Sequence, residues 1–261
     1  MFFFEVLIIV LIFAIYEIII SFYLKYKKHG IVYDKEREKK YAYFVQAEVD
    51  KQNKLVGYEC LLRAYDSEEE QWTLPEHLGT FSLQETITLL NEMFKKDESF
   101  SGFVALNVTL EQLTDLRFTY FVNWAQSKVS PAKLQIEISI TNNLGFIQAR
   151  LLKNKLSFLK NRDVLVIIDR IETTDDYFSR VKPFLKYVGG IKIPMSRYRE
   201  YGEKHWLDLN IGKWVRIAQR NNLKIFITEL ENEEEFALSE KFDFSAYEGF
   251  VISRPKPLKE L

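Results

Sequence analysis

The chain has 261 residues, of which 47% are hydrophobic and 28% are charged, and its formal net charge at pH 7 is −1. This composition can bury a sizeable core and argues against disorder, while the near-zero charge argues against broad DNA or RNA binding, which needs a basic face. A single cysteine, Cys60, excludes an intrachain disulfide and fits a reducing compartment.

The first predicted element is an apolar helix over residues 1–24, MFFFEVLIIVLIFAIYEIIISFYL. A helix needs about 20 such residues to cross the hydrocarbon core of a bilayer. Glu17 interrupts the run, and we expect it either to face a partner helix or to take part in sensing or assembly. No basic stretch precedes the run and no small-x-small site follows it, which argues against a cleaved signal peptide. We therefore expect a transmembrane helix.

The charged segment 25–40, KYKKHGIVYDKEREKK, follows directly. It has no apolar face wide enough to pack, so it predicts a linker or a short helical stalk that pairs two chains. Its early lysines, Lys25, Lys27 and Lys28, place the following domain in the cytoplasm by the positive-inside rule. The sequence thus predicts a single-pass protein of the cell membrane, with residues 41–261 as its cytoplasmic domain.

From Tyr41 onward, short β-rich runs alternate with amphipathic segments. The runs are YFVQAEV, VGYECLL, GFVALNV, KLQIEIS, VLVIID, GGIKI, LKIFIT and YEGFVI, and helix-length segments cover 110–127, 145–160, 174–187, 196–220 and 231–240. This alternation predicts parallel βα units, and about eight strands predict a β/α barrel. A doubly wound open sheet is the alternative, which the lack of a Gly-rich dinucleotide loop weakens.

Polar residues recur near the carboxyl ends of these predicted strands, where a β/α barrel carries its active face. The set comprises Glu59, Asn107, Glu137 and Asp169, with Lys192 and Glu229 at similar places. Oxygen ligands without His or Cys suit Mg²⁺ or Mn²⁺ rather than zinc. Spacing alone leaves two interpretations, a metal–phosphate site or scattered solvent-facing charges.

Several of these segments resemble the EAL domain family. The segment 57–63, GYECLLR, resembles the ExLxR signature of the family. FVALNVT, LQIEIS, VIID-R, IKIP, ITELENEEEF and YEGFVISRPKP then resemble its Asn, Glu, DDFGTG, Lys, AEGVET and QGYYFSRP segments in order. The resemblance covers about 41–257, which is nearly the whole expected domain.

The resemblance implies a TIM-like (β/α)8 barrel of the EAL type that cleaves cyclic di-GMP to pGpG with two Mg²⁺ or Mn²⁺ ions. It implies metal ligands at Glu59, Asn107, Glu137 and Asp169, and a lysine beside the attacking water at Lys192. Glu229 matches the glutamate of the AEGVE segment at the metal site. Arg63 matches an arginine that holds a ligand phosphate, for which its planar fork is suited.

The sequence departs from the family pattern on the catalytic side. Arg170 stands where the second Asp of DDFGTG helps to hold the second metal, and residues 171–174 read IETT instead of FGTG. Ile140 replaces a loop-supporting glutamate, Leu230 replaces the Gly of AEGVE, and Glu248 replaces a Gln. Arg170 can neutralise a phosphate, but it cannot lower the pKa of a water as a dication does. One metal site is thus expected and the second is doubtful.

These departures lead to three hypotheses. The leading one is a degenerate EAL protein that binds cyclic di-GMP as a membrane receptor, as a homodimer, with little or no hydrolysis. The second is an active metal-dependent phosphodiesterase that produces pGpG. The third is a protein-interaction scaffold that has lost the nucleotide and acts on an unknown protein partner.

Overall fold

The computed structural model describes residues 6, 8–19, 40–75, 81–94, 100–172, 174–199 and 209–260. Within the predicted transmembrane segment, residues 8–19 are helical and their apolar side chains are exposed. Among the residues described, no helix is both long enough and apolar enough to cross a membrane. Residues 1–5, 7 and 20–39, which include most of the predicted linker, lie outside the described residues.

Eight strands close into a barrel, as the sequence predicts. The strands are β1 (Tyr41–Val49), β2 (Leu55–Asp66), β4 (Phe103–Asn107), β5 (Lys133–Ser139), β6 (Leu165–Asp169), β7 (Gly190–Pro194), β8 (Lys224–Leu230) and β9 (Ala246–Gly249). They follow the order β1-β9-β8-β7-β6-β5-β4-β2, and β1 also pairs with β2. This last pairing excludes the alternative open sheet. The short β3 (Gln71–Thr73) pairs with the outer part of β2.

The first strand differs from the expected parallel pattern. The strands β2 and β4 to β9 run parallel, whereas β1 is antiparallel to both β2 and β9. The turn 50–54 between β1 and β2 is too short for the crossover that a parallel pair requires. In this turn Asp50 Oδ1 accepts hydrogen bonds from the backbone N–H groups of Gln52 and Lys54, both at 2.9 Å.

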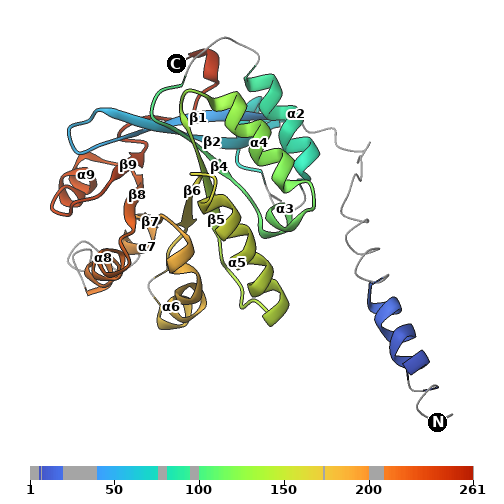
Figure 1. The fold of residues 1–261 in the computed structure, drawn as a ribbon. Coiled ribbons are helices and arrows are strands. Elements are labelled where there is room, and N and C mark those ends of the chain that lie inside the picture. Colours follow the sequence, from blue (N-terminus) through green and yellow to red (C-terminus); the bar gives the residue numbers. More distant parts are fainter. Residues whose placement is uncertain are drawn as a thin grey trace.

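Helices surround the barrel on its outside (Figure 1). They are α2 (Leu83–Met93), α3 (Leu110–Thr114), α4 (Phe118–Val129), α5 (Phe146–Lys160), α6 (Asp175–Val181), α7 (Ser196–Arg199), α8 (Leu209–Asn221) and α9 (Glu233–Ser239), with 3-10 turns η2 (Lys182–Tyr187) and η4 (Leu258–Glu260). The main core lies between helices and strands, where Phe121, Leu156 and Trp214 are fully buried. The predicted segment 110–127 is divided into α3 and α4.

A second, smaller apolar cluster fills the bottom of the barrel. Ile167, Phe226 and Ala246 are its buried members. The rings of Phe103 and Phe226 meet at 6.1 Å although β4 and β8 are not neighbours in the sheet, so this contact crosses the interior. Because alternate residues of a strand share a face, the inward residues one step further along β6 and β9 are Asp169 and Glu248. The apolar cluster therefore supports a polar layer toward the carboxyl ends of the strands.

Because the chain at the start of β4 packs closely on β2, we expect Gly102→Ala to destabilise the fold strongly. Gly102 has φ +73°, and a Cβ there would lie 1.8 Å from the Val56 carbonyl oxygen. We expect this substitution to lower the free energy of unfolding by about 2–4 kcal/mol, through backbone strain and forced movement of β2. Urea denaturation measures the change.

The matched control is Gly212→Ala in helix α8, where a Cβ would meet the end of the Arg216 side chain at 3.6 Å. Helix propensity makes this variant neutral or more stable by up to about 1 kcal/mol. Equal stability changes in the two variants would contradict the close approach of β4 and β2.

Candidate functional site

A buried lysine lies at the centre of the polar layer. Lys192 on β7 is only 1% exposed. Its Nζ lies 2.6 Å from Glu59 Oε2 and 2.8 Å from Glu137 Oε1. It also lies 2.9 Å from Glu48 Oε1 and 2.9 Å from Glu248 Oε2. We call these four glutamates and Lys192 the carboxylate cage.

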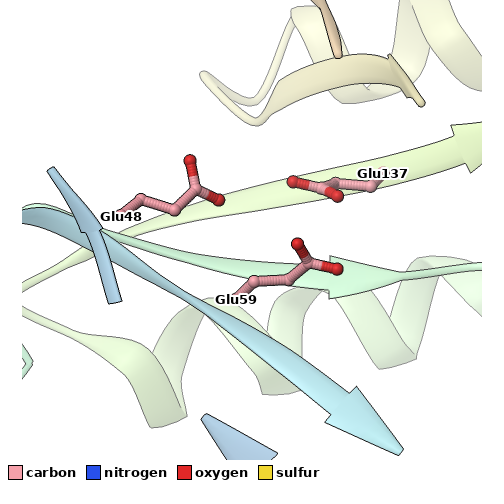
Figure 2. Close-up of side chains that lie close together, drawn as sticks. All are labelled: Glu48, Glu59 and Glu137. Carbon is pink, nitrogen blue, oxygen red and sulfur yellow. The ribbon is translucent and has the colours of Figure 1, made fainter. Parts of the chain in front are cut away.

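Four different strands supply the carboxylates of the cage. Glu48 comes from β1, Glu59 from β2, Glu137 from β5 and Glu248 from β9. Figure 2 shows Glu48, Glu59 and Glu137 with their carboxylates turned toward one another, and their ligand oxygens lie within 4.8 Å of each other. Only closure of the barrel brings strands so distant in the sequence around one point.

The cage holds more negative charge than its lysine can balance. One ammonium has three N–H donors, while four carboxylates surround it. Burial therefore raises the pKa of Glu137 and of Glu248 well above the usual range, and the neighbouring Glu59 adds to both effects. Burial alone would lower the pKa of Lys192, but the four carboxylates raise it well above the usual range. The lysine is thus held as a cation.

Two amide side chains extend the cage. Asn107 Nδ2 donates a hydrogen bond of 2.5 Å to Glu59 Oε1, and Gln135 Nε2 donates one of 2.8 Å to Glu137 Oε1. Burial would raise the pKa of Glu59, yet the Lys192 ammonium and the hydrogen bonds of Glu59 with Glu248, Lys192 and Asn107 lower it overall. Glu59 is the carboxylate that the cage keeps ionised.

Asp169 ends β6 at the edge of the cage. Burial raises its pKa to about 6, and the negative charge of Glu59 adds to the rise, whereas Lys192 and Arg170 oppose it. The backbone N–H of Arg170 donates to Asp169 Oδ1 at 2.7 Å, and Arg170 Nε lies 3.8 Å from Oδ2. The Arg170 side chain is 62% exposed and its φ is +56°. The guanidinium therefore lies on the outer side of Asp169.

The predicted residues Glu59, Glu137 and Lys192 meet in the cage, and Asn107 and Asp169 border it. Arg63 lies on the same face of β2 as Glu59, four residues further along the strand, and is half-buried. Burial lowers the pKa of Arg63, although Glu59 and Glu248 oppose this change. Glu229 is exposed, has φ +60° and lies at an irregularity of β8. The carboxylates of the cage, as defined above, come from other strands than β8.

Sequence reasoning did not select Glu48 or Gln135 as site residues. A polar residue inside an apolar strand usually faces solvent, and only barrel closure shows that β1 turns Glu48 inward. One signal was available, because Gln46 and Glu48 are two residues apart and so share a face of the strand. Glu248 was noted only as a replacement of a family Gln.

The donor set fits a hard divalent cation. Carboxylate and amide oxygens are the ligands that Mg²⁺, Mn²⁺ and Ca²⁺ prefer. The Glu48, Glu59 and Glu137 oxygens converge closely enough to share one ion. In addition, Glu48 Oε2 is buried and accepts no hydrogen bond from the part of the chain that the structure describes. Excess negative charge and a buried free acceptor are both features that a cation would relieve.

Removal of the central charge should destabilise the barrel in a pH-dependent way. We expect Lys192→Met to lower the free energy of unfolding by about 3–5 kcal/mol at pH 7 with a chelator present, because buried carboxylates lose their counter-ion. Carboxyls with a raised pKa bind protons more readily in the folded state, so the cost should shrink toward pH 5 and grow toward pH 8. Chemical denaturation across this range measures it.

Lys155→Met is the control for the loss of a lysine. Its Nζ donates to the Asp115 carbonyl at 3.4 Å and lies 5.7 Å from the Phe118 ring centroid. This variant should lose less than about 1 kcal/mol, with no similar pH trend. A pH-independent loss in Lys192→Met would contradict the charge balance inferred for the cage.

Comparisons with known proteins agree with this fold. The EAL enzyme Bd1971 in its cAMP- and cyclic-di-GMP-bound form has a TM-score of 0.69 at 15% identity, over 92% of this chain and 68% of that chain. The PaMucR phosphodiesterase in complex with c-di-GMP has a TM-score of 0.63 at 18% identity, over 84% and 93%. The Bacillus subtilis YkuI protein, in complex with c-di-GMP and calcium, has a TM-score of 0.64 at 15% identity, over 83% and 56%.

A comparison with curated protein sequences found no match. The sequence profile described as "EAL domain" matches residues 37–255, which is most of the chain. The solved structures independently show the same barrel fold. The chain therefore belongs to the EAL domain family.

Proposed function

We propose that the chain is a membrane-anchored receptor that binds cyclic di-GMP at the mouth of the barrel and hydrolyses it little or not at all. The observation that carries this proposal is the exposed Arg170 beside Asp169, where the family resemblance expects a second carboxylate. A fixed cation there disfavours a second metal ion. Two-metal hydrolysis would then lack either activation of the nucleophile or stabilisation of the leaving group.

Residues suited to bind the nucleotide remain at the mouth. Arg63 offers a half-buried guanidinium, whose fork matches phosphate oxygens. Glu59, Asn107, Glu137 and Asp169 would hold Mg²⁺ or Mn²⁺. A metal ion bound there would neutralise phosphate charge that the carboxylates otherwise repel. Bd1971 and PaMucR, which share the fold, were solved with cyclic di-GMP bound.

The loop after β6 is held in place without the glycines of DDFGTG. Trp214 Nε1 donates to the Glu172 carbonyl at 3.1 Å, and Arg180 Nη2 lies 3.4 Å from Glu172 Oε2. Ile171 is fully buried, and its N–H donates to the Lys192 carbonyl at 3.1 Å. These contacts hold Ile171 and Glu172 in place, and we propose that a loop held in this way favours binding over turnover.

Membrane anchoring and the cytoplasmic location of the barrel are part of the proposal. Their support is the apolar run 1–24 and the lysines that follow it. The exposed apolar side chains of helix 8–19 also need an apolar surrounding, which lipid or a second copy of the chain would supply. Such pairing would place two barrels side by side as a homodimer.

Two other functions each have one supporting observation. An active phosphodiesterase is favoured by the first-metal ligands grouped around Lys192. An interaction scaffold for a protein partner is favoured by Glu48 and Glu248, whose negative charges disfavour an anionic ligand. The following experiment separates the three.

We expect the full-length chain in mild detergent to bind cyclic di-GMP in calorimetry with Mg²⁺ or Mn²⁺, and to form little pGpG in the same samples by chromatography. Arg63→Glu should weaken binding at least about 100-fold, because it places an anion against a phosphate. Arg220→Glu, an exposed charge reversal on α8, should leave the affinity within about twofold.

Metal-dependent pGpG that Glu59→Ala abolishes would establish an active phosphodiesterase instead. Saturating nucleotide that neither binds nor raises the thermal stability of the folded chain would establish the scaffold, because a ligand of the native state must stabilise it.

The membrane proposal makes a separate prediction. The full-length chain should remain in the membrane pellet after an alkaline carbonate wash. Ile12→Arg combined with Ile15→Arg should release much of it, since each charge at the centre of a span costs about 3 kcal/mol. The double change Ile12→Val and Ile15→Val is the matched control and should stay in the pellet. Release of the unchanged chain would exclude an integral anchor.

A further inference from the structure

Glu48 has no role in the site that the family resemblance assigns, yet it is completely buried in the cage. Its Oε1 contacts Lys192 Nζ at 2.9 Å. Its other oxygen, Oε2, accepts no hydrogen bond from the residues described. Burial raises its pKa, with Lys192 opposing and Glu59 adding to the rise. A buried carboxylate with one free oxygen is costly unless a cation or another donor completes it.

Glu48 differs from Glu248 in its position within the cage. Both contact Lys192 Nζ at 2.9 Å, and both are buried. Glu48 belongs with Glu59 and Glu137 to a trio whose ligand oxygens lie within 4.8 Å of each other, whereas Glu248 is not part of this trio. Figure 2 shows how the three carboxylates approach one another. The trio thus defines a single convergence point.

The Lys192 ammonium already occupies this convergence point, at 2.6 to 2.9 Å from each of the three carboxylates. A bound Mg²⁺ or Mn²⁺ would need the same oxygens at about 2.0–2.2 Å, and Ca²⁺ would need them at about 2.3–2.6 Å. An ammonium nitrogen and a metal ion cannot both contact these three carboxylates at one point, because the two cations would overlap. The geometry allows either cation but not both.

We propose that Glu48 is a ligand for one divalent cation, held together with Glu59 and Glu137, and that this cation and the Lys192 ammonium compete for the same place in the barrel. The lysine is the resident cation that keeps the cage stable when metal is absent. Metal entry moves the ammonium toward Glu248 and frees it for other contacts. This inference goes beyond the proposed function, because it requires no nucleotide.

The test uses the full-length chain in detergent with Mn²⁺ alone and no nucleotide, so a failure to bind cyclic di-GMP does not affect it. Calorimetry and Mn²⁺-dependent thermal unfolding give the affinity. Lys192→Met should bind Mn²⁺ at least about tenfold more tightly than the unchanged chain, because the competing ammonium is gone. Equal affinity of the two proteins would overturn the competition.

Glu48→Gln and Glu248→Gln form a matched pair in the otherwise unchanged chain, since each removes one buried charge that contacts Lys192. Glu48→Gln should weaken Mn²⁺ binding at least about tenfold, as expected for a lost ligand, and Glu248→Gln should weaken it less. Equal losses would show a general charge effect and overturn the role of Glu48 as a ligand. This pair keeps the proposal falsifiable if Lys192→Met does not fold.

Discussion

The contact of one ammonium with four buried carboxylates is the interaction on which this barrel depends. A closed eight-stranded barrel has an interior just wide enough for side chains, so each inward polar group must find its partner there. Lys192 can reach the centre because Gly190 and Pro194, its inward neighbours on β7, are small or compact. The apolar cluster below excludes water from that side. The strand order and the closure of the barrel therefore bring the four carboxylates of the polar layer around Lys192.

Three residues that depart from the family pattern lie in the packed interior. Ile140, which replaces a loop-supporting glutamate, is 1% exposed, and Leu230, which replaces a glycine, is fully buried. Ile171 is buried in the same core cluster. Apolar contacts thus occupy positions where the family pattern has a glutamate and a glycine. Restoring a second aspartate at position 170 alone would leave this packing unchanged, so the loop would keep its present path.

Much of the fold could be predicted from sequence because the strands are short, apolar and regularly spaced, and Glu59, Asn107, Glu137, Asp169 and Lys192 lie at equivalent positions in them. Period-2 alternation carries no information on the direction of β1, and the signal for its reversal was the short connection 50–54, which cannot hold a parallel crossover. Glu48 was missed for a different reason, because its inward orientation follows from closure of the barrel. Glu229 has a positive φ, and its role at the metal site stays a prediction.

The reversed first strand also determines where the chain enters the barrel. Tyr41, at the start of β1, pairs with Ala64 near the carboxyl end of β2, so the chain enters the barrel at the rim that carries the mouth. Segment 25–40 spans at most about 55 Å when fully extended. In the proposed membrane-anchored arrangement, a tether on that rim would limit how far the opening can move from the membrane, and a pull along the tether would act on the β1–β2 ladder. Ligand entry and mechanical load would then share one edge of the barrel.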